Sequence, residues 1–462
     1  MPNSHSGGKS SPNLTLAATS LGFILVVLDV TVVNVALDRI KSALETDVTG
    51  LQWVLNAYTL VFASLLLTAG ALGDRFGAKR MFVTGFVIFT AASVACGCAG
   101  TIVLLVAGRI VQGLGAACCV PSSLALLNAA FPDAAARVKA VSLWAGAGGL
   151  AIAAGPVVGG ALVDRLGWPS IFFLNLPLGL LGIWLTLVYA PEAPRASGRG
   201  LDLPGQGLAI VALGALTVGF VESGPLGWTH PVVLAGFTLF AVGTGLFLRV
   251  EARSAEPMLP LSLFQAPAVG AACVVGLLTN FSFYGLMFVF SLFFQISKGY
   301  SPLMAGLAFL PMTALVTVAN LAAGALTARF GPRLPMVLGQ ALAAVGYLAL
   351  APTEAGTSYG TIIVPLLAAG VGAALTVPSM TAAVLANVAR DRAGIAAGAL
   401  NAARQMGGVI GVGVFGSLVV GAADRLAGGM HIALILAGGA QVAGCAVSAI
   451  AGARQATRAK LV

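Results

Sequence analysis

The apolar residues of this chain fall into long blocks that short polar connections separate. Each of fourteen such blocks is about 20 residues long, enough to cross a hydrocarbon core of roughly 30 Å as a helix. A membrane barrel would show short alternating runs instead. The pattern predicts an all-α polytopic membrane protein with spans near 15–37, 51–72, 80–99, 101–121, 141–163, 171–190, 206–223, 231–249, 268–294, 303–328, 335–352, 359–381, 395–421 and 431–452.

Two phrases of the sequence occur twice at nearly the same offset. GALGDRFGAKR at 70–80 is matched by GALTARFGPR at 324–333, and GLGAACCVPSS at 113–123 is matched by GVGAALTVPSM at 370–380. The first pair follows spans two and ten, and the second lies in spans four and twelve. One six-helix unit therefore occurs twice in parallel orientation, a plan known in transporters that bind their substrate between the halves.

The longest polar connections bracket spans seven and eight, which the repeat leaves over as an inserted pair. The N-terminus lacks the charged-then-apolar order of a cleaved signal, so the first block is expected to remain as a helix. We expect a 6 + 2 + 6 arrangement: a disordered cytoplasmic N-terminus at 1–13, an N-terminal six-helix bundle at 14–190, an inserted helix pair with flanking loops at 191–267, a C-terminal six-helix bundle at 268–452 and a cytoplasmic tail at 453–462.

Composition and charge agree with a membrane protein. The chain is 58% hydrophobic and 8% charged, whereas soluble domains carry about 25% charged residues. If the N-terminus is cytoplasmic, seventeen of the 24 lysines and arginines fall on the cytoplasmic side and five on the other. This distribution follows the positive-inside rule. The net charge of +9 therefore needs no nucleic-acid partner, and we expect a multi-pass protein of the cell membrane with both termini in the cytoplasm.

Asp29 is an acidic residue deep inside the first span. Placing a charged Asp at the centre of a membrane helix costs about 2.5–3.5 kcal/mol, so such residues usually serve a function. At 1.5 Å per residue, Asp29 lies about 22 Å from the inner face and Arg109 about 12 Å from the outer face, which gives similar depths. We expect the two to pair and to carry proton coupling; a fixed structural ion pair is the alternative. Glu222 near the outer end of span seven is either a second proton or cation site or a water-exposed boundary residue.

Polar and aromatic side chains within the spans are candidates for a substrate cavity. Amides and aromatic rings suit apolar drugs, but hydrogen bonding or packing between helices explains them equally well. The candidates are Asn34, Trp53, Asn56, Tyr58, Gln112, Asn280, Phe281, Tyr284, Asn401 and Arg404.

The first repeated phrase is expected to form a cytoplasmic gating loop. Its glycines allow a close approach and a tight turn, and its basic residues hold it on the cytoplasmic side. The second copy of the phrase has Ala328 where the first has Asp74, so only the first copy carries an acid. We expect Asp74 to act as a latch by binding the other half at the positive inner end of span thirteen, near Arg392 and Gly394. The loop consists of Gly70, Gly73, Asp74, Arg75, Gly77, Lys79 and Arg80.

Span five contains the stretch GPVVGG. Gly148, Ile152, Gly155 and Gly159 recur at spacings of three and four residues and make a flat stripe that lets helices approach closely. Pro156 removes a backbone hydrogen bond and allows a bend. The residues concerned are Gly155, Pro156, Gly159 and Gly160.

Together these segments resemble the major facilitator superfamily, specifically its fourteen-helix drug:proton antiporter branch. Several of these segments are similar in sequence to the corresponding segments of actinobacterial antibiotic-resistance exporters, including the methylenomycin-resistance type. The resemblance covers essentially the whole chain and is carried, in order, by LDVTVVNVAL (28–37), LQWVLNAYTL (51–60), GALGDRFGAKR (70–80), AGRIVQGLGAA (107–117), GPVVGG (155–160), GWPSIFFLNLPLG (167–179) and GALNAARQMGG (398–408).

The resemblance implies an alternating-access fold and outward drug export coupled to proton entry. It also implies that GPVVGG marks an antiporter and that the arginine at the position of Arg109 is linked to proton transfer. The chain departs from the family pattern at Asp38, where proline is usual, and at Pro169, where many relatives carry a charged or bulky residue.

We therefore expect a proton-coupled secondary exporter of apolar or amphipathic drugs or antibiotics, acting as a monomer in the lipid bilayer. The chain has no G-x-x-x-x-G-K-[ST] phosphate loop, no nucleophile set and no metal-ligand spacing. An enzyme, a cofactor and a metal site are thus not expected. Two alternatives stay open: a dedicated exporter of one endogenous metabolite or self-made antibiotic, and a non-transporting membrane scaffold or receptor.

Overall fold

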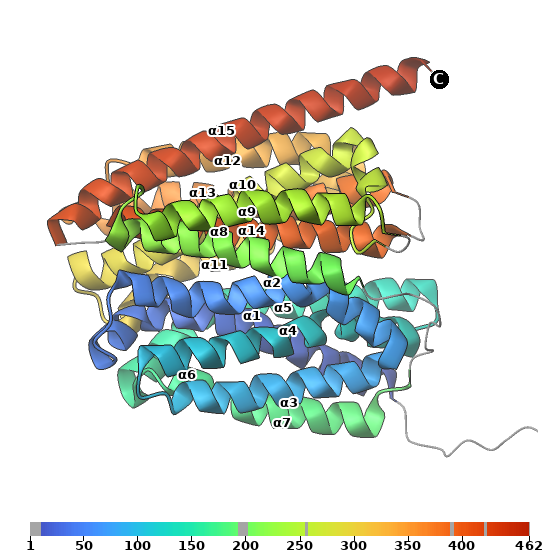
Figure 1. Ribbon diagram of the computed structural model, residues 1–462, viewed down its shortest axis with the longest axis horizontal. Coiled ribbons are helices and arrows are strands. Elements are labelled where there is room, and N and C mark those ends of the chain that lie inside the picture. The colour runs from blue at the N-terminus through green and yellow to red at the C-terminus, as the bar shows by residue number, and fades with distance from the viewer. Residues whose placement is uncertain (1–10, 193–201, 255–256, 389–391, 420–422, 462) are drawn as a thin grey trace, which may run out of the picture.

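The computed structural model describes residues 11–192, 202–254, 257–388, 392–419 and 423–461, and within these ranges it is a helical bundle without strands (Figure 1). Fourteen helical segments of this part are long and apolar enough to cross a membrane, and one of them, Ser170–Tyr189, consists of two consecutive α-helices. The predicted fold class is therefore confirmed. The helices are α1 (Pro12–Ala43), α2 (Val48–Phe76), α3 (Ala78–Gly97), α4 (Ile102–Ala130), α5 (Ala134–Leu166), α6 (Ser170–Phe173), α7 (Asn175–Tyr189), α8 (Leu203–Leu226), α9 (Pro231–Glu251), α10 (Pro267–Leu292), α11 (Pro302–Phe330), α12 (Arg333–Leu350), α13 (Tyr359–Ala386), α14 (Ala393–Val419) and α15 (Ala423–Leu461).

Several helices extend beyond the predicted blocks. α4 runs to Ala130 although the predicted span stops at Pro121, because a proline inside a membrane helix removes one hydrogen bond without ending the helix. At the N-terminus, residues 1–10 of the expected disordered segment lie outside the described residues, and Pro12 already belongs to α1. At the C-terminus, α15 continues through most of the expected tail, to Leu461.

Helix ends follow local chemistry. The side chains of Asp47, Asp133 and Ser301 each accept a hydrogen bond from the backbone N–H three residues later, which satisfies an otherwise free donor. Gly77 and Gly331 end α2 and α11 with φ angles of 100° and 74°, a region that residues with a side chain rarely adopt. These glycines are equivalent in the two copies of the repeated phrase, so each copy is mainly the end of a helix followed by one glycine turn.

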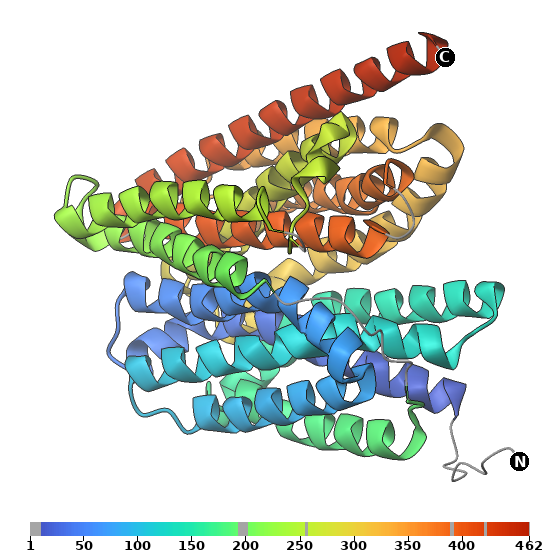
Figure 2. The same ribbon diagram turned by 45° about the vertical axis from the view of Figure 1, so that its right-hand side comes forward.

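Helices at equivalent places of the two repeats make equivalent contacts. α1 packs on α5, α2 on α4 and α3 on α4, while α10 packs on α14, α11 on α13 and α12 on α13. Figure 2 shows α1–α7, blue to green, together below the orange and red C-terminal helices. The chain therefore folds as two similar halves.

The two most extensive direct interfaces between the halves are related by the repeat: α5 packs on α11, and α2 packs on α14. Helix α8 packs on both α2 and α14, and α9 packs on α8. We call the α2–α14 interface the covered seam and the α5–α11 interface the uncovered seam. α9 is the outermost member of the insert, with only 17% of its most apolar window buried inside the protein.

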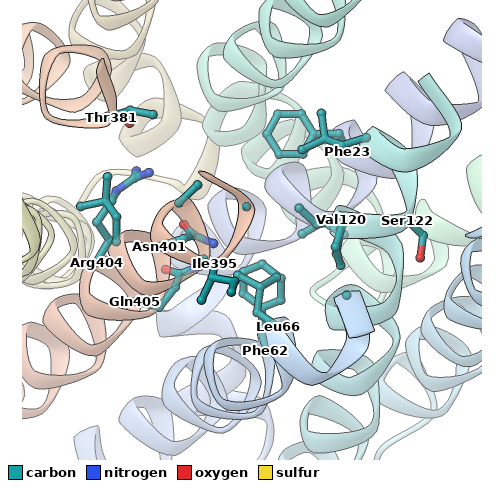
Figure 3. A pocket seen from close by; sticks show the side chains of 18 of the residues that line it. Phe23, Phe62, Leu66, Val120, Ser122, Thr381, Ile395, Asn401, Arg404 and Gln405 are labelled. Atoms are coloured by element: carbon teal, nitrogen blue, oxygen red, sulfur yellow. The ribbon is translucent and has the colours of Figure 1, made fainter. Parts of the chain in front are cut away.

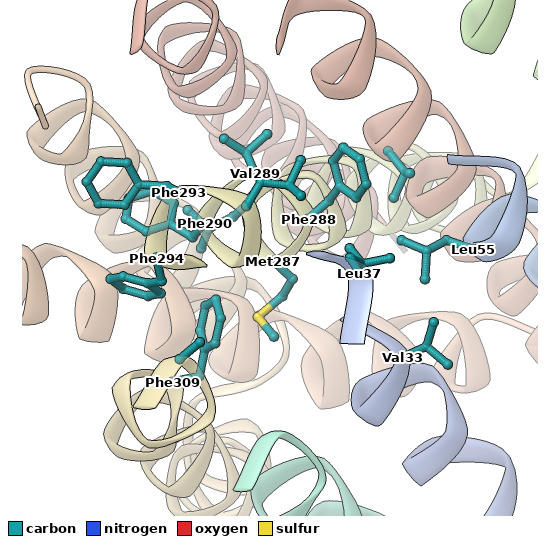
Figure 4. Packing of buried hydrophobic residues seen from close by; sticks show 14 of the residues in the cluster. Val33, Leu37, Leu55, Met287, Phe288, Val289, Phe290, Phe293, Phe294 and Phe309 are labelled. Atoms are coloured by element: carbon teal, nitrogen blue, oxygen red, sulfur yellow. The ribbon is translucent and has the colours of Figure 1, made fainter. Parts of the chain in front are cut away.

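Buried apolar side chains from both halves close one end of the bundle (Figure 4). Val33, Leu37 and Leu55 meet the C-terminal end of α10, where a π-helical turn at Phe293–Ser297 follows the α-helix. Ser291 Oγ of α10 donates a hydrogen bond to the Asn34 carbonyl of α1. The ring centroids of interlocking aromatic pairs here are 5.3–5.8 Å apart, in the set Phe290, Phe293, Phe294, Tyr300 and Phe309.

Candidate functional site: a central cavity beside a buried ion pair

A cavity of about 1290 Å³ lies between the two halves (Figure 3). Residues of α1, α2, α4 and α5 line it from one side, and residues of α10, α11, α13 and α14 line it from the other. It reaches the end of the bundle at which α2 ends and α14 begins, and the apolar cluster of Figure 4 closes the opposite end. Drug-sized ligands occupy pockets of about 300–1,000 Å³, so this cavity has room for one.

Aromatic rings form part of the wall contributed by the first half. Phe23 of α1 and Trp144 of α5 stack with their ring centroids 3.9 Å apart, and both line the cavity. The sequence analysis did not select either residue. Phe23, Val27, Val30 and Asn34 are three or four residues apart and share one helix face, so counting back from Asn34 would have found Phe23. No comparable signal marked Trp144.

Polar side chains of the second half face the same space. Asn401, Arg404 and Gln405 of α14 line the cavity (Figure 3), together with Tyr284 of α10. Nε of Arg404 has no hydrogen-bond partner among the described residues. The cavity therefore combines apolar walls with amide groups and the cationic side chain of Arg404.

Of the ten cavity residues expected from the sequence, four line the cavity: Asn34, Tyr284, Asn401 and Arg404.

The other six expected cavity residues are buried or half-buried outside its lining, and several of them make contacts between helices. Tyr58 donates its hydroxyl hydrogen to the Val26 carbonyl at 3.3 Å. Phe281 packs edge to face on Phe415, with centroids 5.2 Å apart. Helix-to-helix contacts satisfy such side chains as well as a cavity does, so sequence position could not separate the two uses. The six residues are Trp53, Asn56, Tyr58, Gln112, Asn280 and Phe281.

Asp29 and Arg109 form an ion pair inside the N-terminal half. Nη1 of Arg109 lies 2.5 Å from Oδ2 of Asp29, and the side chains are about 1% exposed. Gln112 donates through Nε2 to Oδ1 of Asp29 at 2.8 Å, and Asn175 donates to the same oxygen at 3.3 Å. Ser93 accepts from Gln112 at 2.7 Å. The structure thus brings the two expected partners together within a polar cluster from α1, α3, α4 and α7.

The Arg109 guanidinium has further partners on α2 and α6. Its Nε donates to the Val54 carbonyl at 3.1 Å, and its central carbon lies 4.3 Å from the Tyr58 ring centroid and 5.9 Å from that of Phe172. Cation–π contacts of this kind stabilise a desolvated guanidinium by about 2 kcal/mol. Breaking the pair would require the whole cluster to rearrange.

The ion pair lies next to the cavity without lining it. Val26, Val27 and Val30 of α1 line the cavity, whereas Asp29 and Arg109 do not. The hydroxyl of Tyr58, whose ring lies against Arg109, donates to the carbonyl of Val26. Helix α1 therefore contributes both to the cavity wall and, through Asp29, to the charged cluster.

Glu222 lies apart from this cluster. The indole N–H of Trp53 donates to Oε1 of Glu222 at 3.0 Å, which ties α8 to the first turns of α2. Glu222 is half-buried. The structure therefore joins two of the expected functional residues in a contact between the insert and the N-terminal half.

The expected gating loop is largely helical. Gly70 and Gly73 lie inside α2, where a Cβ would meet Pro121 or Ser122 of α4 at 3.8 Å and 3.4 Å. These are ordinary van der Waals distances, so the packing of α2 on α4 requires a glycine at neither position. Of the three glycines, only Gly77 makes a turn, because it alone has a positive φ angle.

Of the four charged residues of this phrase, only Asp74 lines the cavity. Asp74 is exposed, as are Arg75 and Arg80. Lys79 donates to the Ala190 carbonyl at 2.8 Å, which fixes the end of α7. Arg392 also lines the mouth, but among the described residues it forms no ion pair with Asp74. The cavity mouth separates the two expected latch partners in this conformation.

The GPVVGG stretch packs on two helices at once. A Cβ at Gly159 would lie 3.0 Å from Val32 Cα, and one at Gly155 would collide with Thr31, both on α1. On the other side, a Cβ at Gly160 would lie 2.5 Å from the Pro302 carbonyl oxygen, and one at Gly306 would collide with the Pro156 carbonyl, both across the uncovered seam. The stripe thus allows close approach of α5 to its own half and to the other half.

The chain is similar to named resistance and efflux proteins over most of its length. It is 38% identical over 409 residues to the methylenomycin A resistance protein of Streptomyces coelicolor, covering 88% of this chain and 86% of that protein. It is 38% identical over 406 residues to the multidrug resistance protein Stp of Mycobacterium tuberculosis, with coverages of 88% and 75%. It is 34% identical over 417 residues to the tetracenomycin C resistance and export protein of Streptomyces glaucescens, with coverages of 90% and 77%.

Solved structures share the fold at low sequence identity. A bacterial homolog of the human lysosomal transporter Spinster, in an inward-facing and unoccupied conformation, gives a TM-score of 0.69 at 17% identity, over 96% of this chain and 98% of that one. The family model described as Major Facilitator Superfamily matches residues 19–412. By its sequence and its two similar halves around a central cavity, the chain belongs to the major facilitator superfamily of membrane transporters.

Proposed function

We propose that this protein exports apolar or amphipathic drugs, antibiotics among them, in exchange for protons. The observation that carries the proposal is the cavity between the halves, which reaches one end of the bundle and is closed at the other. Alternating access requires such an arrangement, because the substrate must be exposed to one side of the membrane at a time. The names of the relatives, which refer to multidrug resistance, methylenomycin and tetracenomycin C, indicate the substrate class.

The proton-coupling role is assigned to Asp29 and Arg109. A carboxylate buried in a membrane is costly unless it is paired, so protonation of Asp29 would release Arg109 and loosen the cluster of helices around them. The adjacent cavity wall on α1 would then respond to the charge state of Asp29. One entering proton supplies about 1.4 kcal/mol per pH unit and about 2.3 kcal/mol per 100 mV, enough to drive export against a concentration gradient.

The proposal includes a topology. With both termini in the cytoplasm, the cavity mouth near Asp74 and Arg392 faces the cytoplasm, where the basic connections gather. The start of α1 and the end of α15 lie at the same end of the bundle (Figure 2). We assign the protein to the cell membrane as a monomer that contacts lipid, protons and a small-molecule substrate.

The test is drug susceptibility of a pump-deficient host, combined with drug-induced collapse of a pH gradient in inside-out vesicles. We expect wild type to raise tolerance to several unrelated compounds, and Asp29→Asn and Arg109→Ala to return both readouts to background at normal expression. Glu354→Gln is the matched control, because this acid is exposed and should leave both readouts unchanged. Full drug-dependent proton flux in Asp29→Asn would overturn the coupling role.

The breadth of the panel separates this function from its alternative. A dedicated exporter of one endogenous metabolite would protect against a single compound and its close analogues. Protection against structurally unrelated compounds would favour a multidrug exporter, for which the mixed apolar and cationic lining of the cavity is suited.

A further inference from the structure

The inserted helix pair brings together two acidic residues that the transport cycle above does not use. Asp202 precedes α8, and Glu251 is the last residue of α9. They lie at the end of the insert that borders the cavity mouth, where Asp202 itself is part of the lining. Because α8 and α9 run antiparallel as a hairpin, residues about fifty positions apart in sequence become neighbours.

Each carboxyl group binds a backbone N–H through one oxygen only. Oδ1 of Asp202 accepts from Gly205 N at 2.9 Å, which caps α8. Oε2 of Glu251 accepts from Leu259 N at 3.0 Å, in the segment that follows α9. The second oxygens, Oδ2 of Asp202 and Oε1 of Glu251, are buried and have no donor among the described residues. Both carboxyl groups are therefore held in place while one oxygen of each is left free.

The two free oxygens point at the same place. A Cβ added to Gly205 would lie 2.6 Å from Asp202 Oδ2 and 2.9 Å from Glu251 Oε1, and the two carboxyl groups are within hydrogen-bonding reach of each other. Glu251 is only 3% exposed, so water cannot readily solvate its free oxygen. Two carboxylates at this distance repel strongly, and such pairs hold one proton between them.

No basic side chain neutralises the pair within the described part of the chain, where the only ion pair is Asp29–Arg109. The charged residues on the adjoining elements are exposed, and one of them, Arg392, donates to Ser262 Oγ at 3.0 Å. Apart from the pair itself, they are Asp74 and Arg75 at the end of α2, Arg249 and Arg253 at the end of α9, and Arg392 at the start of α14.

We propose that Asp202 and Glu251 form a proton-binding site that holds one shared proton between Asp202 Oδ2 and Glu251 Oε1. The site is separate from Asp29 and belongs to the inserted helices. Loss of its proton leaves two facing carboxylates that push the base of α8 away from the end of α9.

The site is connected to the cavity mouth through the segment that follows α9. Glu251 holds this segment at Leu259, and its residues Pro257, Met258, Pro260 and Ser262 line the cavity. Ser262 in turn accepts a hydrogen bond from Arg392 of the C-terminal half, and Met258 accepts one from Thr68 of the N-terminal half. A change in the charge of the pair is therefore expected to shift a segment that contacts both halves. The role of this shift in transport rests on the proposed function.

Infrared spectroscopy of the full-length protein in lipid nanodiscs tests the shared proton without requiring transport. We expect a carbonyl stretching band of a neutral carboxyl group at neutral pH, lost equally in Asp202→Asn, Glu251→Gln and the double variant. Equal band intensity in wild type and both single variants would overturn the site. A band that Glu251→Gln removes and Asp202→Asn leaves intact would overturn the sharing.

Glycine variants on α8 separate the pair without removing either carboxyl group. Gly205→Ala places a methyl group against both oxygens, and we expect it to weaken or shift the band. Gly207→Ala is the matched control, because a Cβ there meets nothing within 4 Å. Identical spectra for the two glycine variants would contradict the geometry.

The pH profile of drug efflux tests the link to transport. We expect Asp202→Asn and Glu251→Gln to export drug with an altered dependence on cytoplasmic pH, and Gly207→Ala to keep the wild-type profile. Unchanged profiles in both acid variants would overturn the link while leaving the shared proton standing. Failure of wild type to export any drug would instead refute the proposed function and leave the infrared result intact.

Discussion

The two seams between the halves are related by the internal repeat, yet they are held by different means. At the uncovered seam, glycines bring α5 and α11 into backbone contact, and Thr317 donates to the Gly149 carbonyl at 3.1 Å. At the covered seam, the long side chain of Gln52 reaches from α2 to the carbonyls of Val412 and Gly413 at 3.0 and 2.8 Å. Close backbone packing tolerates no added atoms, whereas a side-chain bridge with a third helix over it leaves room to adjust.

One further contact distinguishes the uncovered seam. The carboxylate of Asp164 at the end of α5 accepts hydrogen bonds from Ser301 Oγ at 2.9 Å and Leu303 N at 3.0 Å. It thus caps the N-terminus of α11 in the other half, where a negative charge is favoured. This contact lies at the closed end of the bundle, opposite the mouth where Asp74 is expected to engage α14.

Both seams can be compared with one measurement of opening at the closed end. Spin labels at Gly100→Cys and Gly356→Cys, in a background without other cysteines, report the distance between the loops of the two halves at the closed end of the bundle. Both glycines are exposed and a Cβ at either meets nothing within 4 Å, so the labels should not disturb packing.

The largest effect is expected for Gly160→Leu at the uncovered seam. The added side chain would meet the backbone of Pro302 and Leu303, and overpacking of this kind costs about 1–3 kcal/mol. The closed population should fall by about 5- to 150-fold relative to the open one. Gly146→Leu on the same helix is the control, because its side chain has open space. A closed population that Gly160→Leu leaves unchanged would refute backbone packing as the basis of this seam.

A smaller effect is expected for Gln52→Ala at the covered seam. The variant removes two hydrogen bonds to carbonyls that also have helical partners, so the loss should be about 1 kcal/mol, or about fivefold in the same label distances. An effect as large as that of Gly160→Leu would show that the two seams contribute equally to closure and would remove the contrast between them.

Asp164→Ala should open the same end by about two- to fivefold, because an exposed charge at a helix N-terminus contributes about 0.3–1 kcal/mol. Asp164→Asn, which keeps an acceptor, should have a smaller effect. The difference between the two variants should shrink as salt concentration rises, since salt screens exposed charges. A difference that is independent of salt would assign the contact to hydrogen bonding alone.

The smallest effect on opening is expected for Trp53→Phe. It removes the hydrogen bond to Glu222, which ties α8 to α2 within one half and crosses neither seam. Thermal unfolding should detect a loss of about 0.5–1.5 kcal/mol, while the label distances stay as in wild type. A shift of the distances would show that α8 does not move with α2.

The sequence predicted the fold well because a bilayer requires long apolar helices, and their order revealed the repeat. Depth along the helices also predicted that Asp29 and Arg109 would meet. Depth could not predict which polar side chains face the cavity. Gln112 and Tyr58 are polar like Asn401, but they form hydrogen bonds to other residues of the N-terminal half instead of lining the cavity. The pairing of Asp202 with Glu251 could not be predicted from the sequence, since only the turn of the α8–α9 hairpin brings these residues together.

The attachment of α8 also decides where the moving parts of the molecule begin and end. Gln206 binds the Ser64 carbonyl at 2.8 Å and also the Thr68 hydroxyl, and Glu222 binds Trp53, so both ends of α8 are tied to α2. Toward α14 it packs apolar side chains such as Leu213 and Leu216 against Met406 and Val409. We therefore expect the insert to move with the N-terminal half, in which case the connection between α9 and α10 must span any separation of the two halves.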